Sequence, residues 1–154
     1  MGLIKLDFDV DAPVERVWDF GLQAVRIPEW QFDVVAVKGI DGPIDCKGTK
    51  YILVYQKAGR LLESPVEVSR FEPETWTVET TGRTPLGGYF KSRTEMSAVA
   101  KNRTHIDWVM DYRLPGWFVG VLMDKLLFQM AFKRTVQRYN TNFKVLAEGN
   151  VINV

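Results

Sequence analysis

Residues 104–116 read THIDWVMDYRLPG, and the spacing of the apolar residues changes at the end of this stretch. Up to residue 114 every second residue is apolar, which is the pattern of a strand with one buried face. These residues are Ile106, Trp108, Met110, Tyr112 and Leu114. After Pro115 and Gly116, apolar residues recur every three or four positions as far as Leu146. This second pattern predicts one long helix of about eight turns.

The same alternation recurs towards the N-terminus. We expect strands at residues 3–10, 34–40, 49–56, 61–71, 76–81, 89–100 and 104–114. From residue 49 onward the connections are short and rich in Gly, Pro and Asn, so successive strands are expected to be antiparallel neighbours. Two short helices are expected after the first strand. One begins at residues 11–13, with Pro13 in its first turn, and the other begins near Pro28.

These elements predict an α+β fold in which a curved antiparallel sheet of about seven strands wraps around the long C-terminal helix. A twisted sheet with one apolar face and a single long amphipathic helix buries both apolar surfaces most simply in this way. The chain of 154 residues contains no repeat and no linker-like segment. We therefore expect a single domain covering residues 1–154.

Composition excludes several functional classes. The 20 Lys and Arg residues balance the 19 Asp and Glu residues and are scattered, so we expect no nucleic-acid partner. One His and one Cys do not provide a metal site, and we expect no cofactor. The N-terminal residues lack the apolar core of a secretion signal, and no apolar stretch reaches the ~20 residues of a transmembrane helix. These observations indicate a cytoplasmic protein.

The inward faces of the strands and the long helix outline a candidate ligand pocket. The residues expected to line it are Trp30, Val66, Val68, Trp76, Val78, Phe90, Ser92, Thr94, Met96, Trp108, Met110, Tyr112, Val119, Leu122, Met123, Leu126 and Met130. Small side chains at Thr80, Ser92, Thr94 and Ala98 leave room for a cavity, although a solid core would use the same residue types. The strand at 49–56 is apolar on both faces, so the sequence does not orient it.

Three segments resemble one known family. They are DAPVERVW at residues 11–18, IPEW at residues 27–30 and PGW at residues 115–117. Together with the order of the elements, they make nearly the whole chain similar to the START-like, or SRPBCC, superfamily and its polyketide cyclase/dehydrase-like branch. The resemblance implies a helix-grip fold with a deep pocket for lipids, polyketides or other aromatic or isoprenoid-like compounds. It also implies that either a carrier or an enzyme is possible.

The residues favour a carrier over an enzyme, because the charged residues of the oriented strands point away from the expected pocket. His105 is expected on the outward face of its strand. The best inward candidate for a catalytic group is Tyr112, and the sequence leaves open that Arg26 or Arg83 reaches the pocket from a loop. The enzyme alternative is a polyketide cyclase or dehydrase, acting as a lyase or isomerase without metal.

A third alternative is an interaction protein. Trp117 and Phe118 follow Pro115 and Gly116 and would then form an exposed aromatic tip that contacts a membrane surface or a protein partner. The competing interpretation is that both rings cover the mouth of the pocket.

Overall fold

A computed structural model, which describes residues 2–85, 87–116 and 125–152, contains one seven-stranded antiparallel sheet and a long C-terminal helix. The strands are β1 (Gly2–Val10), β2 (Val34–Lys38), β3 (Lys50–Lys57), β4 (Arg60–Glu72), β5 (Thr77–Arg83), β6 (Tyr89–Ala100) and β7 (Arg103–Arg113). The helices are α1 (Val14–Gly21), α2 (Ile27–Trp30) and α4 (Lys125–Ala147), with short 3-10 turns η1 (Ala24–Arg26) and η2 (Pro73–Thr75). The predicted fold class is confirmed, and most strand boundaries lie within two residues of the expected ones.

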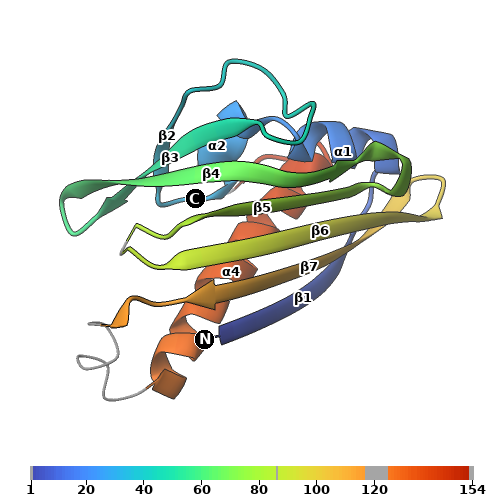
Figure 1. The fold of residues 1–154 in the computed structure, drawn as a ribbon. Coiled ribbons are helices and arrows are strands. Elements are labelled where there is room, and N and C mark those ends of the chain that lie inside the picture. The colour runs from blue at the N-terminus through green and yellow to red at the C-terminus, as the bar shows by residue number, and fades with distance from the viewer. Residues whose placement is uncertain (1, 86, 117–124, 153–154) are drawn as a thin grey trace.

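The strands lie in the order β1-β7-β6-β5-β4-β3-β2. Strands β2 to β7 form a meander of neighbours, and β1 adds to the far edge by pairing with β7, with Phe8 opposite Ile106. Figure 1 shows this order as a continuous change of colour across the sheet, with blue β1 next to the orange β7. The sheet is open, and β1 and β2 are its two edge strands.

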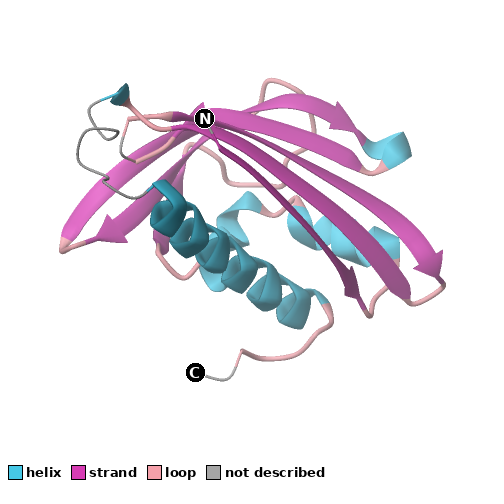
Figure 2. Ribbon diagram, turned by 90° about the horizontal axis from the view of Figure 1, so that it is seen from below, coloured by secondary structure: helices cyan, strands magenta, loops and turns pink. Residues whose placement is uncertain are grey.

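Helices α1, α2 and α4 lie on one side of the sheet (Figure 2). The sheet curves over α4, and α1 and α2 lie on the same concave side (Figure 2). The aromatic rings of Phe20 and Trp30 pack against Phe143 of α4, with centroids 5.0 and 5.3 Å apart. These contacts attach the two short helices to the C-terminal half of α4 and complete a helix-grip arrangement.

One part of this core surrounds α1, and we call it the packed end. It consists of Val10, Val17, Trp18, Val68, Phe71 and Trp76. The three valines are fully buried, and the Trp18 ring lies 5.9 Å from Phe71 and 5.7 Å from Trp76. Burying an apolar side chain of this size contributes about 1.5–3 kcal/mol, so this end anchors α1 to the sheet.

Two short segments differ from the sequence prediction. Trp76 was expected to begin a strand, but it ends η2 in a left-handed conformation with φ 51°, and β5 begins one residue later. The turn formed by Pro73 to Thr75 displaces the strand start, while the Trp76 ring still packs inward on Trp18. Pro13 was expected in the first turn of a helix, but it immediately precedes α1, which begins at Val14.

The orientation of the first turns of α4 also differs from the prediction. Leu126 and Met130 were expected to face inward, but their side chains are 64% and 48% exposed. Apolar residues surround the helix axis between 126 and 130, because Leu127 and Phe128 lie beside them. The sequence pattern therefore does not specify which side of this segment faces the sheet.

In the described part of the chain, none of the helices combines the length and apolar character needed to cross a membrane. The predicted pocket residues Val119, Leu122 and Met123 and the predicted aromatic tip at Trp117 and Phe118 lie outside the described residues.

Candidate functional site

A cavity of about 430 Å³ lies between the concave face of the sheet and α4. Such a volume falls within the range of small-molecule sites in proteins, and such sites are mostly apolar. The helix contributes side chains that share one face, namely Phe128, Ala131, Phe132, Thr135, Val136, Tyr139, Asn140 and Phe143. Strands β3 to β7 contribute the opposite wall, and α1 and α2 close one side.

Many of the residues expected from alternation lie in this lining. They are Trp30, Val66, Val78, Phe90, Ser92, Thr94, Met96, Trp108 and Met110. They come from α2 and from four neighbouring strands, and the structure brings them together around one space. Val68 and Trp76 belong to the packed end and do not line the cavity, whereas Trp18 lies at the boundary between the two regions and contributes to the lining. Leu126 and Met130 are exposed and also lie outside the lining.

Tyr112, the sequence candidate for a catalytic group, lies outside the lining. Its ring packs against Phe132 and Phe128, with centroids 5.1 and 6.3 Å apart, and lies against the backbone of Gly2 in β1. Burial raises the pKa of this phenol above its usual value. The side chain has the inward orientation expected from alternation, but it is positioned near the edge strand and not at the cavity.

The cavity exists because the middle of the concave face carries small side chains. Ser64, Thr80, Ser92 and Thr94 all line it, and the hydroxyl oxygens of Thr80 and Ser92 are 2.8 Å apart and hydrogen-bonded. The hydroxyl of Ser64 donates to the carbonyl oxygen of Arg83. Because three of these hydroxyls already have partners, the wall tolerates an apolar occupant. Ala98, which was expected to contribute, is exposed near the end of β6.

The structure also orients β3, which the sequence left open. Tyr51, Leu53 and Tyr55 face the cavity, whereas Gln56 is exposed on the other face. Burial raises the pKa values of Tyr51 and Tyr55, and the nearby Asp33 carboxylate raises that of Tyr55 further. Both phenols therefore stay protonated at neutral pH and provide neutral polar groups in the wall.

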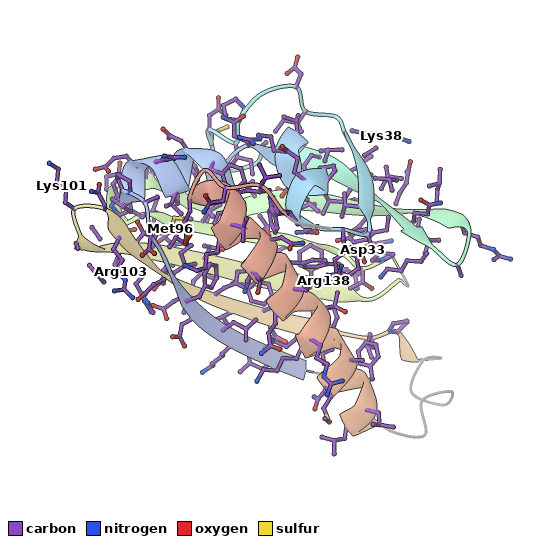
Figure 3. All side chains as sticks on the ribbon, turned by 180° about the vertical axis from the view of Figure 1, so that it is seen from behind. Asp33, Lys38, Met96, Lys101, Arg103 and Arg138 are labelled. Carbon is purple, nitrogen blue, oxygen red and sulfur yellow. The ribbon has the colours of Figure 1, made fainter. Side chains whose placement is uncertain are left out.

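One edge of the cavity carries a charged group of residues, which we call the polar cluster: Asp33, Lys57 and Tyr139. The Asp33 side chain is only 9% exposed and accepts hydrogen bonds from the Lys57 ammonium, at 2.8 Å, and from the Tyr139 hydroxyl. All three residues line the cavity. Burial, the hydrogen bond to Asp33 and its negative charge raise the pKa of Tyr139, so this phenol remains a donor. Figure 3 shows Asp33 beside α4.

Strand pairing explains why these residues meet. Asp33 immediately precedes β2, and its carbonyl oxygen accepts a hydrogen bond from the Gln56 amide at 2.9 Å. Lys57 ends β3, and Ala58 and Gly59 then turn the chain with φ values of 50° and 75°, a tight turn that suits glycine. The two strand ends therefore lie side by side, and α4 places Tyr139 over them.

The polar cluster corrects one interpretation from the sequence. The pocket was expected to be nearly free of ionisable groups, but the cavity is lined by a carboxylate and an ammonium group. Asp33 and Lys57 enter the lining from strand ends, where alternation gives no orientation. The two loop arginines considered earlier do not line the cavity. Arg26 forms an ion pair with Glu29 at 2.6 Å, and the Arg83 guanidinium lies over the Tyr89 ring.

His105 lies on the outward face of β7, as alternation predicts. Its Nδ1 is 2.6 Å from an Asp9 carboxylate oxygen on β1, and its Nε2 is 3.4 Å from Asp107. The hydrogen bond with Asp9 raises the pKa of His105. Among residues 2–85, 87–116 and 125–152, no group of three or more His, Cys, Asp or Glu side chains has the geometry of a metal site.

A second depression, of about 880 Å³, is wider and more open, and its lining takes residues from both faces of β3 to β7, including Tyr112. Its lining contains side chains of opposite charge on adjacent strands, including Lys50 opposite Glu67 and Lys91 opposite Asp111. These charges are solvated and partly compensate one another. The cavity between the sheet and α4 is therefore the better candidate for a binding site.

A family model described as polyketide cyclase/dehydrase and lipid transport matches residues 1–148. No curated protein matches the sequence. This family match covers nearly the whole described fold, including every element that lines the cavity.

Several solved structures share the fold at low sequence identity. A protein from Thermus thermophilus superposes with a TM-score of 0.77 at 14% identity, covering 96% of this chain and 98% of the other. The Zhui aromatase/cyclase from Streptomyces sp. R1128 gives 0.71 at 14% identity, with 96% and 92% covered. Norcoclaurine synthase from Thalictrum flavum, solved in complex with dopamine and hydroxybenzaldehyde, gives 0.70 at 12% identity, with 99% and 89% covered. At these identities the likeness establishes the helix-grip fold alone.

Proposed function

Because this chain belongs to the polyketide cyclase/dehydrase and lipid transport family, we propose that it binds a small hydrophobic molecule in the cavity between its sheet and α4. The observation that carries the proposal is the cavity of about 430 Å³ with a predominantly apolar lining. Residues such as Trp108, Met110 and Phe132 offer a surface that water wets poorly. Moving an apolar ligand from water into such a space is favourable by about 25 cal/mol per Å² of apolar surface removed from water.

The proposed ligand contacts come from the sheet and from α4. Trp108 and Met110 of β7 supply a large flat surface and an adaptable thioether, and Phe128 and Phe132 of α4 are stacked with centroids 5.9 Å apart. This lining suits a lipid, a polyketide or another aromatic or isoprenoid-like compound. The proposed location of the protein is the cytoplasm.

The proposal is tested by titrating the protein with N-phenyl-1-naphthylamine, an uncharged apolar dye. We expect a saturable rise in dye fluorescence with one site per chain, and native mass spectrometry of the undenatured protein should detect a bound small molecule. Thr94→Phe places a ring in the cavity and should lower dye affinity at least about tenfold, since a filled site leaves no room for the dye.

The matched control for this experiment is Arg93→Phe, which puts the same ring on the opposite face of β6. Arg93 is exposed and its ion pair with Glu95, at 3.2 Å, lies on the surface, so dye affinity should stay unchanged. The proposal is wrong if the dye does not bind, or if both variants reduce its fluorescence equally.

Acid–base catalysis on a bound carbonyl compound is the second candidate, and the polar cluster favours it. In this proposal the Asp33 carboxylate removes a proton from the carbon next to a ligand carbonyl, and Tyr139 is a positioning residue that orients Asp33. The test is exchange of the C1 protons of 2-tetralone in D₂O, followed by NMR. Wild-type protein should accelerate exchange, and Asp33→Asn should abolish the acceleration. Equal exchange rates with and without protein would exclude this role.

A further inference from the structure

One side of the cavity carries two polar side chains with buried atoms that have no hydrogen-bond partner among the described residues. The Gln31 side-chain oxygen Oε1 and the Asn140 side-chain nitrogen Nδ2 are shielded from solvent, and neither has a hydrogen-bond partner in the described part of the chain. Both residues line the cavity. Buried polar atoms are nearly always hydrogen-bonded in folded proteins, so two such atoms on residues that line one cavity point to an occupant that completes them.

These two residues lie next to the polar cluster. Gln31 precedes Asp33 by two positions, and Asn140 follows Tyr139 on α4. The Phe32 ring lies 5.3 Å from the Tyr139 ring, and the Asn142 amide donates to the Trp30 carbonyl oxygen at 3.2 Å, so the segment around Gln31 crosses this part of the helix. The cavity therefore has polar groups on this side, whereas Trp108, Met110 and Phe128 provide its apolar surface.

The chemistry of the two atoms specifies what would bind them. An amide oxygen needs a donor, and an amide nitrogen needs an acceptor, and a hydroxyl group supplies both. The Asp33 carboxylate and the Lys57 ammonium on the same side pair at 2.8 Å and neutralise each other, and Lys57 is the only cation among the described residues that line the cavity. A negatively charged ligand group would therefore lose its hydration without gaining an unpaired counter-ion, which favours a neutral group.

We propose that the ligand is a neutral, largely apolar alcohol or phenol, whose hydroxyl groups donate to the oxygen of Gln31 and accept from the amide of Asn140. This inference rests on the proposed binding function and adds the class of ligand to it. It also assigns to Gln31 and Asn140 the role of selecting hydroxylated molecules over hydrocarbons of the same shape.

The experiment compares three probes of one ring system by displacement of N-phenyl-1-naphthylamine: 2-naphthol, 2-methylnaphthalene and 2-naphthoate. In the wild-type protein 2-naphthol should bind about tenfold more tightly than 2-methylnaphthalene, although it is the less hydrophobic of the two. 2-Naphthoate should bind more weakly than 2-naphthol. A wild-type protein that binds 2-methylnaphthalene as tightly as 2-naphthol, or that prefers 2-naphthoate, would overturn the proposal.

The variants Gln31→Leu and Asn140→Leu separate this selectivity from a structural role. Each should reduce the preference for 2-naphthol to about threefold or less, while the thermal midpoint of the ligand-free protein stays the same or rises, because an unsatisfied buried polar group has been removed. Gln56→Leu, at an exposed position of β3, is the matched control and should keep the full preference.

The outcomes distinguish this inference from the function on which it rests. Dye and 2-methylnaphthalene binding without any preference for 2-naphthol would refute the ligand class and leave the binding function intact. A preference that survives both leucine variants would show that water or other groups satisfy the hydroxyl, and would refute the role of Gln31 and Asn140. Failure of the dye and of all three probes to bind would refute both proposals.

Discussion

The packed end and the cavity belong to the same sheet and use the same inward-facing strand positions, yet one is closely packed and the other is hollow. At the packed end, Val68 of β4 is fully buried among large neighbours. Four residues earlier on the same face of β4, Ser64 lines the cavity together with Ser92 and Thr94 of β6. The difference lies in the volume of the inward side chains, because the alternation of the strands is the same in both regions.

The largest expected effect comes from truncating one tryptophan in each region. Trp18→Ala should lower the free energy of unfolding by about 3–5 kcal/mol, since the ring is 5% exposed and packs on Phe71 and Trp76. Both rings border the cavity, but Trp108→Ala should cost only about 1–2 kcal/mol, because this ring is half-buried and loses fewer contacts than the buried Trp18 ring. Urea denaturation of both variants measures the difference, and equal losses would contradict the distinction between the two regions.

Adding volume should also destabilise the packed end more than the cavity. Val68→Phe forces a ring into the packed end and should lower the free energy of unfolding by about 1–3 kcal/mol. Thr94→Phe places the same ring in the cavity and should change stability by less than about 1 kcal/mol, because space is available there. Thermal unfolding of the two variants tests this, and a Thr94→Phe loss as large as that of Val68→Phe would mean that the cavity does not accept the ring.

The sheet and most of the cavity wall were predictable from the sequence for a physical reason. In β6 and β7, residues such as Arg93 and Asp107 mark the outward face unambiguously, so Ser92, Thr94 and Trp108 had to face inward. Alternation did not orient β3, whose two faces are both apolar. Similarly, the apolar pattern of α4 did not show whether Leu126 and Met130 face the sheet, because apolar residues surround the helix axis in this segment.

The polar side of the cavity was not predictable in the same way. Asp33 and Lys57 meet only because β2 pairs with β3, and Tyr139 reaches Asp33 across a separation of 106 residues. No local pattern carries this information, and the residues lie at strand ends where alternation stops. The signal that the sequence does contain is weaker: a tyrosine and an asparagine occupy adjacent positions on the largely apolar inward side of an amphipathic helix.

A smaller effect should come from the polar cluster and would show how much it stabilises the hollow region. Tyr139→Phe removes the hydrogen bond to Asp33 and should lower the free energy of unfolding by about 1–1.5 kcal/mol. Tyr89→Phe is the matched control, since Tyr89 is 57% exposed, and should have almost no effect. Urea denaturation distinguishes the two, and if Tyr139→Phe were as stable as its control, the cluster would contribute nothing to the fold.

The smallest expected effect is a pH dependence of stability that leaves the cavity unaffected. His105 lies on the outward face of the sheet, and its hydrogen bond with Asp9 raises its pKa above the ordinary value of 6.5. A histidine whose pKa is higher in the folded state contributes its full stabilisation when the pH is below its unfolded-state pKa. This contribution is lost as the pH rises through the folded-state pKa. The thermal midpoint should therefore fall slightly between about pH 6 and pH 8.

Asp9 does not produce this slope, because its pKa is lowered in the folded protein. The stability that Asp9 contributes is lost only in acid, as the pH falls through its folded-state pKa. His105→Gln should remove the slope between about pH 6 and pH 8. Dye affinity should stay constant over the same range in both proteins, because His105 is not among the residues that line the cavity. Dye affinity that followed the His105 titration would show that the outward face of β7 is coupled to the cavity, and the two regions would then not be independent.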